Sequence, residues 1–184
     1  MRLSAIDPDD LTADQQRLYD ALSSRPEVQR SGLVGPFAIW MHAPGMGAAM
    51  ARLGGAVRFE SSLPGAVTEV AICSVGAYYR SKFEFAAHRP MALAAGVDEA
   101  ALDALAIGDD PGFEDDLRAA HAVAMELLSE HRLTDETFAD ARARFGEQGV
   151  VELVTTVGYY SLISLMLNGF ESPLPAGMTD PFPD

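Results

Sequence analysis

The sequence has a single cysteine, few basic residues and no long apolar run, and each shortage argues against a class of protein. Cys73 is the only cysteine among 184 residues, so no disulfide framework can form within the chain. The 13 Lys and Arg face 27 Asp and Glu, and this net charge of −14 would repel nucleic-acid phosphates. No uninterrupted apolar stretch reaches the roughly 18 residues of a membrane span, and the polar, acidic start is unlike a signal peptide. We therefore expect a cytoplasmic protein that binds neither nucleic acid nor a membrane.

The length and composition are those of one globular domain with a helical fold. The 184 residues are 48% hydrophobic and 22% charged, which predicts a single domain over 1–184. Pro and Gly interrupt the chain at intervals suited to helices, and no segment alternates apolar and polar residues between hairpin turns. The predicted fold class is therefore all-α. Residues 171–184 contain four prolines and are predicted to form an extended arm.

Local signals predict where several helices begin and end. Thr12 is an expected N-cap, Pro64 is expected in the first turn of an apolar helix, and Gly146 is expected to end a helix. Pro90 should kink the helix that contains it, or loosen its first turns. Segment 31–45 is a loop rich in large apolar side chains, so we expect it to pack inward or to line a pocket.

The stretch SKFEFAAH, residues 81–88, supports two interpretations. Glu84 and His88 lie one helical turn apart, and a carboxylate beside an imidazole orients the ring and raises its basicity, which suits proton transfer near neutral pH. Ser81 and Glu84 also form an S-x-x-E capping box. The two interpretations compete for the Glu84 side chain. If Glu84 caps the helix, Glu69 becomes the better partner for His88; if Glu84 turns to His88, Ser81 caps alone.

Other polar residues are weaker candidates for chemistry. Glu69 interrupts an apolar helix, and Cys73 falls four residues later on the same face, where it is best interpreted as a small buried hydrophobe. His42 is a metal-ligand type, but the sequence has no H-x-x-x-H motif and no cysteine cluster, so we expect no metal. His121 and His131 belong to a long acidic helix and are expected at the surface.

The segment 63–97 resembles the core of the carboxymuconolactone decarboxylase family, which shares its fold with the alkyl hydroperoxidase D-like (AhpD-like) proteins. The shared pattern is a Glu, then eleven residues, then a short motif that ends in His; here it is Glu69, Ser81, Glu84 and His88. In the peroxidase branch, the positions that match Ser81 and Glu84 are the two cysteines of C-x-x-C. The segments 35–44 and 153–175 also resemble that family.

The resemblance implies an all-α, AhpD-like subunit that assembles as a trimer or hexamer. It also implies cofactor-independent decarboxylation or proton transfer on a small carboxylic or lactone substrate. His88 would act as general acid or base, and Glu84 or Glu69 would orient it. The candidate substrate contacts are Trp40, His42, Ser81, Tyr78 and Asn168. Arg80 or Arg89 could offset the negative charge of the chain near an anionic substrate.

Two alternatives remain open. One is peroxide reduction through Cys73, which is disfavoured because the chain lacks the C-x-x-C pair that supplies an attacking thiolate and a resolving partner. The other is a non-catalytic oligomeric protein with a relict site. Subunit association itself is expected because the apolar final helix, the apolar loop residues and the arm offer more apolar surface than one small domain buries.

Overall fold

A computed structural model describes residues 1–25, 28–29, 32–174 and 177–182, and within these residues the regular structure is helical, with no strand. The all-α prediction is confirmed. The helices are α1 (Ala13–Ser23), α3 (Pro36–Trp40), α4 (Pro44–Phe59), α5 (Gly65–Tyr78), α6 (Lys82–Ala94), α7 (Glu99–Ile107), α8 (Asp115–Glu130) and α9 (Asp135–Gly169).

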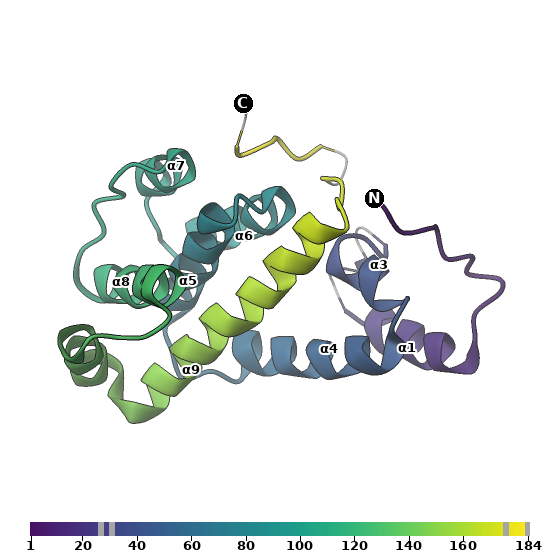
Figure 1. The fold of residues 1–184 in the computed structure, drawn as a ribbon, viewed down its shortest axis with the longest axis horizontal. Coiled ribbons are helices and arrows are strands. Elements are labelled where there is room, and N and C mark those ends of the chain that lie inside the picture. Colours follow the sequence, from purple (N-terminus) through teal and green to yellow (C-terminus); the bar gives the residue numbers. More distant parts are fainter. Residues whose placement is uncertain (26–27, 30–31, 175–176, 183–184) are drawn as a thin grey trace.

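Helix α9 runs through the middle of the molecule and separates two groups of helices (Figure 1). On one side, α5 packs against α6, α7, α8 and α9. On the other side, α4 packs against α1, α3 and α9. Each group has its own hydrophobic cluster: Leu22, Trp40 and Val57 belong to the α1–α4 cluster, and Val67 and Phe85 belong to the α5–α8 cluster. Residues of α9 contribute to both, so this helix joins the two halves of the core.

Some of the predicted helix ends are confirmed and others differ. Thr12 caps α1 in a complete capping box with Gln15. Pro64 is the N-cap of α5 rather than a residue of its first turn. Pro90 has no N–H to donate to the Ala86 carbonyl, and α6 nevertheless runs from Lys82 to Ala94 without a break.

Gly146 does interrupt α9, although the chain resumes a helix directly after it. Its φ of 70° and ψ of 177° lie in a region that is essentially restricted to glycine. The expected stop is therefore a kink between two helices. The segment 31–45 contains α3 and packs inward as expected, because Trp40 and Met41 are almost fully buried.

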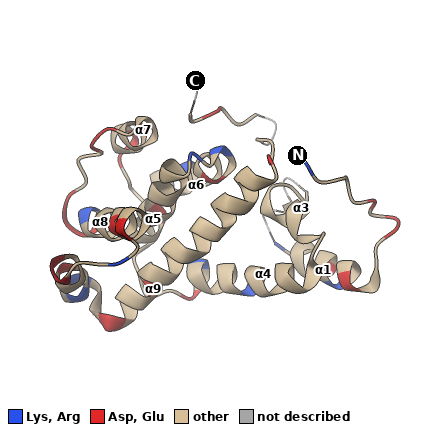
Figure 2. Ribbon diagram, in the orientation of Figure 1, with Lys and Arg blue, Asp and Glu red and all other residues tan. Residues whose placement is uncertain are grey.

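The second half of α9 is strongly apolar. Charged residues are scarce along it (Figure 2), and none follows Glu152 before its end at Gly169. Among the described residues, α9 is the one helix long and apolar enough to cross a membrane, with a mean hydropathy of 1.6 over 18 residues. Half of that window is buried inside the fold, as in the core helix of a soluble protein, which meets the same criterion. The exposed face of α9 still presents Val151, Val154, Leu162 and Leu165.

The described part of the C-terminal arm has no helix and is attached to the start of α6. The Phe182 side chain is 2% exposed and packs against Phe85, with 5.2 Å between ring centroids. Arg80 lies over the Phe182 ring and donates a hydrogen bond to the Phe182 carbonyl. Lys82 forms a salt bridge with Asp180. The arm is thus part of the core beside the polar residues described next.

Candidate active site

Close packing of α5 against α6 sets the geometry of the candidate site. Gly76 of α5 lies against the backbone of α6, where an added Cβ would be 3.3 Å from the Phe85 nitrogen. The turn between the helices places Arg80 at a φ of 47°, and the Ser81 N–H donates to the Gly76 carbonyl. This tight connection brings Glu69 of α5 opposite His88 of α6.

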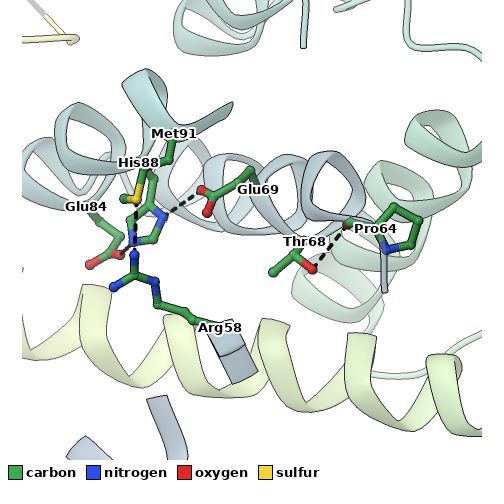
Figure 3. Close-up of polar contacts among 7 residues, drawn as sticks. All are labelled: Arg58, Pro64, Thr68, Glu69, Glu84, His88 and Met91. Atoms are coloured by element: carbon green, nitrogen blue, oxygen red, sulfur yellow. Dashed lines mark hydrogen bonds and ion pairs between the residues drawn. The ribbon is translucent and has the colours of Figure 1, made fainter. Parts of the chain in front are cut away.

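His88 lies between two carboxylates (Figure 3). Its Nδ1 is 2.8 Å from Glu69 Oε2, and its Nε2 is 3.1 Å from Glu84 Oε1. All three side chains are largely buried, with 7%, 13% and 4% exposure for His88, Glu69 and Glu84. Because both ring nitrogens face acceptors, the ring is arranged to donate from both, which is the protonated form.

The electrostatics of the site favour the charged imidazole. Burial alone disfavours a charged ring, but the hydrogen bonds with Glu69 and Glu84 and the charges of these carboxylates outweigh it. Together they raise the pKa of His88 from 6.5 to about 9. At neutral pH the site is therefore an imidazolium held by two carboxylates.

The capping-box prediction for residues 81–84 is wrong. The Ser81 side chain makes no capping hydrogen bond, and its buried Oγ has no partner within the described chain. Glu84 is directed to His88 instead, because the imidazolium offers the buried carboxylate an opposite full charge, which a backbone N–H does not. The choice between Glu69 and Glu84 as the partner of His88 also disappears, since both contact the ring.

A cavity of about 380 Å³ opens beside this group. Glu84 and His88 line it, whereas Glu69 is not among its lining residues. The wall is mainly apolar and aromatic. Its other members include Phe37, Trp40, Phe83, Met91, Ile163 and Met178.

Two tyrosines of α9 complete the polar part of the wall. The ring of Tyr160 meets His88 edge-on, with 5.0 Å between centroids, and Tyr159 lies beside Tyr160. Burial, followed by the nearby charge of Glu84, raises the pKa of both hydroxyls well above 10, so both stay protonated and can donate hydrogen bonds. Gly54 makes room for Tyr159, because an added Cβ would lie 2.3 Å from its hydroxyl oxygen. Neither tyrosine was predicted as a site residue, because nothing in the local sequence indicates that the ring of Tyr160 meets His88.

The basic residues of the cavity are Arg25 and Arg58, not those expected. Arg25 donates to the Ala51 carbonyl at 2.6 Å, and Arg58 donates to the Met91 sulfur at 3.2 Å. The predicted Arg80 and Arg89 lie elsewhere. Arg80 is used by the C-terminal arm, and Arg89 forms salt bridges with Glu99 and Asp103. Neither arginine lines the cavity, because the acids of α7 hold Arg89 and the backbone and ring of Phe182 hold Arg80.

Of the predicted substrate contacts, Trp40 alone lines this cavity. Its indole N–H is buried and has no hydrogen-bond partner in the described part of the chain. His42 is exposed and lines a different hollow, beside the N-terminal segment. Tyr78 donates to the Leu128 carbonyl, and Asn168 donates to the Tyr79 carbonyl.

Four of the predicted contacts lie outside this cavity. His42, Tyr78, Asn168 and the buried Ser81 do not lie at the cavity of this chain. Tyr78 and Asn168 lie away from the cavity because their polar side-chain groups donate hydrogen bonds to the backbone carbonyls of Leu128 and Tyr79.

The described residues contain no group of three or more His, Cys, Asp or Glu side chains arranged to hold a metal ion. At the candidate site, each nitrogen of His88 is engaged by a carboxylate, which leaves no free nitrogen for a cation.

His121 forms a second polar contact with α5, contrary to the prediction that it is exposed. Its Nδ1 is 2.8 Å from the Oγ of the fully buried Ser74, and its ring packs edge-on against Phe113. Burial lowers the pKa of His121, and the charge of Asp110 opposes this only in part. The sequence alone shows that the helix containing His121 has an acidic surface, and it does not indicate that Ser74 of α5 lies opposite this histidine. His131 is exposed as expected.

Comparison with solved structures identifies the fold. The AhpD core of an uncharacterized peroxidase-related protein from Ralstonia eutropha JMP134 aligns with a TM-score of 0.76 and 16% sequence identity, over 95% of this chain and 92% of that chain. The debrominase Bmp8, as a cysteine-to-alanine variant in complex with 2,3,4-tribromopyrrole, aligns with a TM-score of 0.71 and 13% identity, over 96% and 92%.

No protein-family model matches the sequence, and no curated protein matches it either. The chain therefore has the AhpD-like fold, as the resemblance predicted. At these identities the similarity defines the fold and leaves the chemistry to be argued from the site.

Proposed function

We propose that the protein is a cofactor-independent enzyme that moves a proton to or from carbon in a small carboxylic or lactone substrate, as in the carboxymuconolactone decarboxylase family. The observation that carries the proposal is the imidazole of His88, paired with two carboxylates in the wall of an apolar cavity. Perturbed pKa values in a cavity are typical of catalytic groups.

The remaining wall suits the charge that such a reaction develops. When a carboxy-γ-lactone loses carbon dioxide, the electron pair of the broken C–C bond passes into an enolate, which then takes a proton at carbon. The protonated hydroxyls of Tyr159 and Tyr160 supply hydrogen-bond donors for an enolate oxygen. Arg25 and Arg58 bring positive charge to the cavity of an otherwise acidic chain, which favours a substrate that carries a carboxylate.

Peroxide reduction is disfavoured by the surroundings of the single thiol. Cys73 is fully buried, and burial together with the charges of Glu69 and Glu84 raises its pKa well above 9. A thiol of this kind forms little of the thiolate that attacks a peroxide. Ser81 and Glu84 occupy the positions that hold cysteines in the peroxidase branch.

We also propose that the protein is a homo-oligomer, a trimer or hexamer as the resemblance implies. The exposed Val151, Val154, Leu162 and Leu165 of α9 support association, because water-exposed apolar faces of this kind are typical of interfaces.

The proposed function is tested by following solvent deuterium into a panel of γ-lactones, with and without a carboxylate, and by measuring carbon dioxide release. The double variant Glu84→Gln/His88→Gln should lower the rate by roughly 10²–10⁴, the usual contribution of general acid–base groups. The matched control is His131→Asn, which changes an exposed histidine in a left-handed cap that Asn tolerates, and it should keep the full rate. Absence of both deuterium uptake and carbon dioxide release across the panel, or full activity of the double variant, would show that the proposal is wrong.

A further inference from the structure

We infer that Glu84, rather than His88, is the group that exchanges a proton with the substrate, and that His88 is a positioning residue that holds the Glu84 carboxylate at the cavity wall. The inference rests on the proposed function and assigns roles within the same site. It reverses the expectation from the sequence, in which His88 was the proton carrier and a carboxylate oriented it.

A carboxylate lies against each nitrogen of the His88 ring, so neither nitrogen is free to take a proton from the substrate. An imidazole can accept a proton from a carbon acid only through a nitrogen lone pair that faces the substrate. Nδ1 faces Glu69 at 2.8 Å, and Nε2 faces Glu84 at 3.1 Å. Transfer through Nδ1 would first have to break the hydrogen bond to Glu69, and transfer through Nε2 would have to separate the buried ion pair with Glu84.

Glu84, in contrast, has one carboxylate oxygen that is free to exchange a proton with the substrate. Glu84 lines the cavity, and Oε1 is the oxygen that contacts His88. Its second oxygen, Oε2, makes no hydrogen bond or ion pair with any described residue. Glu69 differs in both respects, because its Oε2 holds the far side of the ring and the residue is absent from the cavity lining.

Charged and titratable groups face the site from five parts of the chain. Glu69 comes from α5, Glu84 and His88 from α6, Arg58 from α4, Arg25 from the segment after α1, and the neutral hydroxyls of Tyr159 and Tyr160 from α9. When Glu84 accepts a proton it becomes neutral, and His88 remains paired with the Glu69 carboxylate. The protonated state of Glu84 therefore leaves no unpaired buried charge on the triad.

The proton-transfer step balances without a further reactant. In exchange, the C–H bond breaks, its proton forms an O–H bond on Glu84, and its electron pair moves to the substrate carbonyl oxygen as an enolate. In decarboxylation, the C–C bond to the substrate carboxylate breaks, carbon dioxide leaves, and the electron pair stays on the substrate as an enolate. The Glu84 carboxylate takes up one proton from water, and its O–H passes that proton to the carbanionic carbon, which returns Glu84 to the carboxylate and accounts for the one proton consumed in the overall reaction.

A consequence for pH dependence follows from His88 keeping its proton. With the pKa of His88 at about 9, the exchange rate should show no inflection near 6.5, where an ordinary histidine titrates. The rate should decline as pH rises through about 9, because a neutral His88 no longer holds Glu84 with a charge-assisted bond.

The charge state of His88 can be tested in the wild-type protein without any substrate. Side-chain ¹⁵N NMR of histidine-labelled protein at pH 7.5, assigned by the loss of signals in His88→Gln, should show both His88 nitrogens protonated. A neutral His88 with one unprotonated nitrogen at this pH would overturn the inference.

The roles of the two residues are separated by chemical rescue of deuterium exchange. Glu84→Ala should lose roughly 10²–10⁴ in rate, and added formate should restore part of it by acting as the missing carboxylate. The matched control Glu69→Ala should not be rescued by formate, because Glu69 is not among the residues that line the cavity. His88→Gln, which can still donate to Glu84, should lose about ten- to a hundredfold, as expected for a misplaced catalytic group.

These variants also separate failure of the inference from failure of the proposed function. If Glu84→Ala keeps its rate while His88→Gln loses as much as the double variant, His88 is the proton carrier and the inference is wrong, although the proposed function stands. Circular dichroism and cooperative urea unfolding of each variant establish that it is folded before rates are compared.

Discussion

His88 and His121 both lie against α5, and the fold gives them opposite charge states. His88 faces two carboxylates, which raise its pKa to about 9 despite burial. His121 faces the hydroxyl of Ser74, and burial lowers its pKa. The Ser74 hydroxyl also donates to the Val70 carbonyl at 2.7 Å, so its single proton is committed and His121 donates to it through Nδ1–H. Burial acts in the same direction on both rings, and the partner decides which form is stable.

The two histidines also differ in what they can reach. His88 lies in the wall of the cavity, next to Tyr160 and Glu84. His121 packs on Phe113 and is not among the residues that line that cavity. A hydrogen-bonded buried histidine is therefore not by itself a sign of catalysis; the charged partner and the access to a ligand distinguish the candidate site from a structural contact.

The largest expected difference between the two regions is in stability at pH 7.5. His88→Leu leaves two buried carboxylates without their shared cation and should lower the free energy of unfolding by roughly 3–5 kcal/mol. His121→Leu removes one hydrogen bond but leaves Ser74 bonded to Val70, so about 1 kcal/mol should be lost. Urea unfolding of both variants measures the two values. Equal losses would mean that the carboxylates around His88 do not depend on its charge.

The next prediction is that the two histidines change stability with pH in opposite directions. The folded-state pKa of His88 is raised from 6.5 to about 9, so its contribution is complete below pH 6.5 and is lost as pH rises through about 9. At about 1.4 kcal/mol for each pKa unit, the loss is on the order of 3 kcal/mol. The folded-state pKa of His121 is lowered, so its contribution is present above pH 6.5 and is lost as pH falls through the lowered value.

This prediction is measured by unfolding the wild type, His88→Gln and His121→Gln at a series of pH values. Subtracting each variant from the wild type removes the titration of groups common to both proteins. If the two differences in free energy of unfolding, each between the wild type and one variant, changed in the same direction with pH, the assigned charge states would be wrong.

The smallest expected effect belongs to the Ser74 contact. Ser74→Ala removes the acceptor of His121 and should cost about 1 kcal/mol, while the charge state of His88 stays unchanged in ¹⁵N NMR. Ser161→Ala is the matched control, because Ser161 makes the same bond to the carbonyl four residues earlier, at Val157, and has no histidine partner. A change at His88 caused by Ser74→Ala would show that the two regions are coupled through α5.

The sequence predicts the helical fold and the local part of the site. The spacing of Glu84 and His88 on one helix is set by the 3.6-residue period, so it is visible in a single sequence. Glu69, from the preceding helix, stood out because it interrupts an apolar run, and the resemblance to a known family then joined it to the same site. The same local rules predicted a Ser81–Glu84 capping box that does not form, because a tertiary charge interaction takes the Glu84 side chain.

The rest of the cavity depends on packing between distant segments and had no local signal. Arg25 follows α1, Arg58 lies in α4 and Tyr159 lies in α9, so these residues are spread over more than a hundred positions of the sequence. The packing of α4 against α9 brings the last two together. Arg89 was a reasonable candidate because it is next to His88 in sequence. Successive residues of a helix point about 100° apart, however, and Arg89 faces the acids of α7.

The kink at Gly146 has a consequence for how the chain can vary. The residue is exposed, and an added Cβ would meet no atom within 4 Å, so neither packing nor chemistry restricts the position. Its φ of 70° and ψ of 177° nevertheless strain every other amino acid. In a mutational scan that measures fitness, Gly146 should be intolerant of substitution as Glu84 should be, and a search for functional residues by intolerance alone would select a surface kink together with the candidate active site.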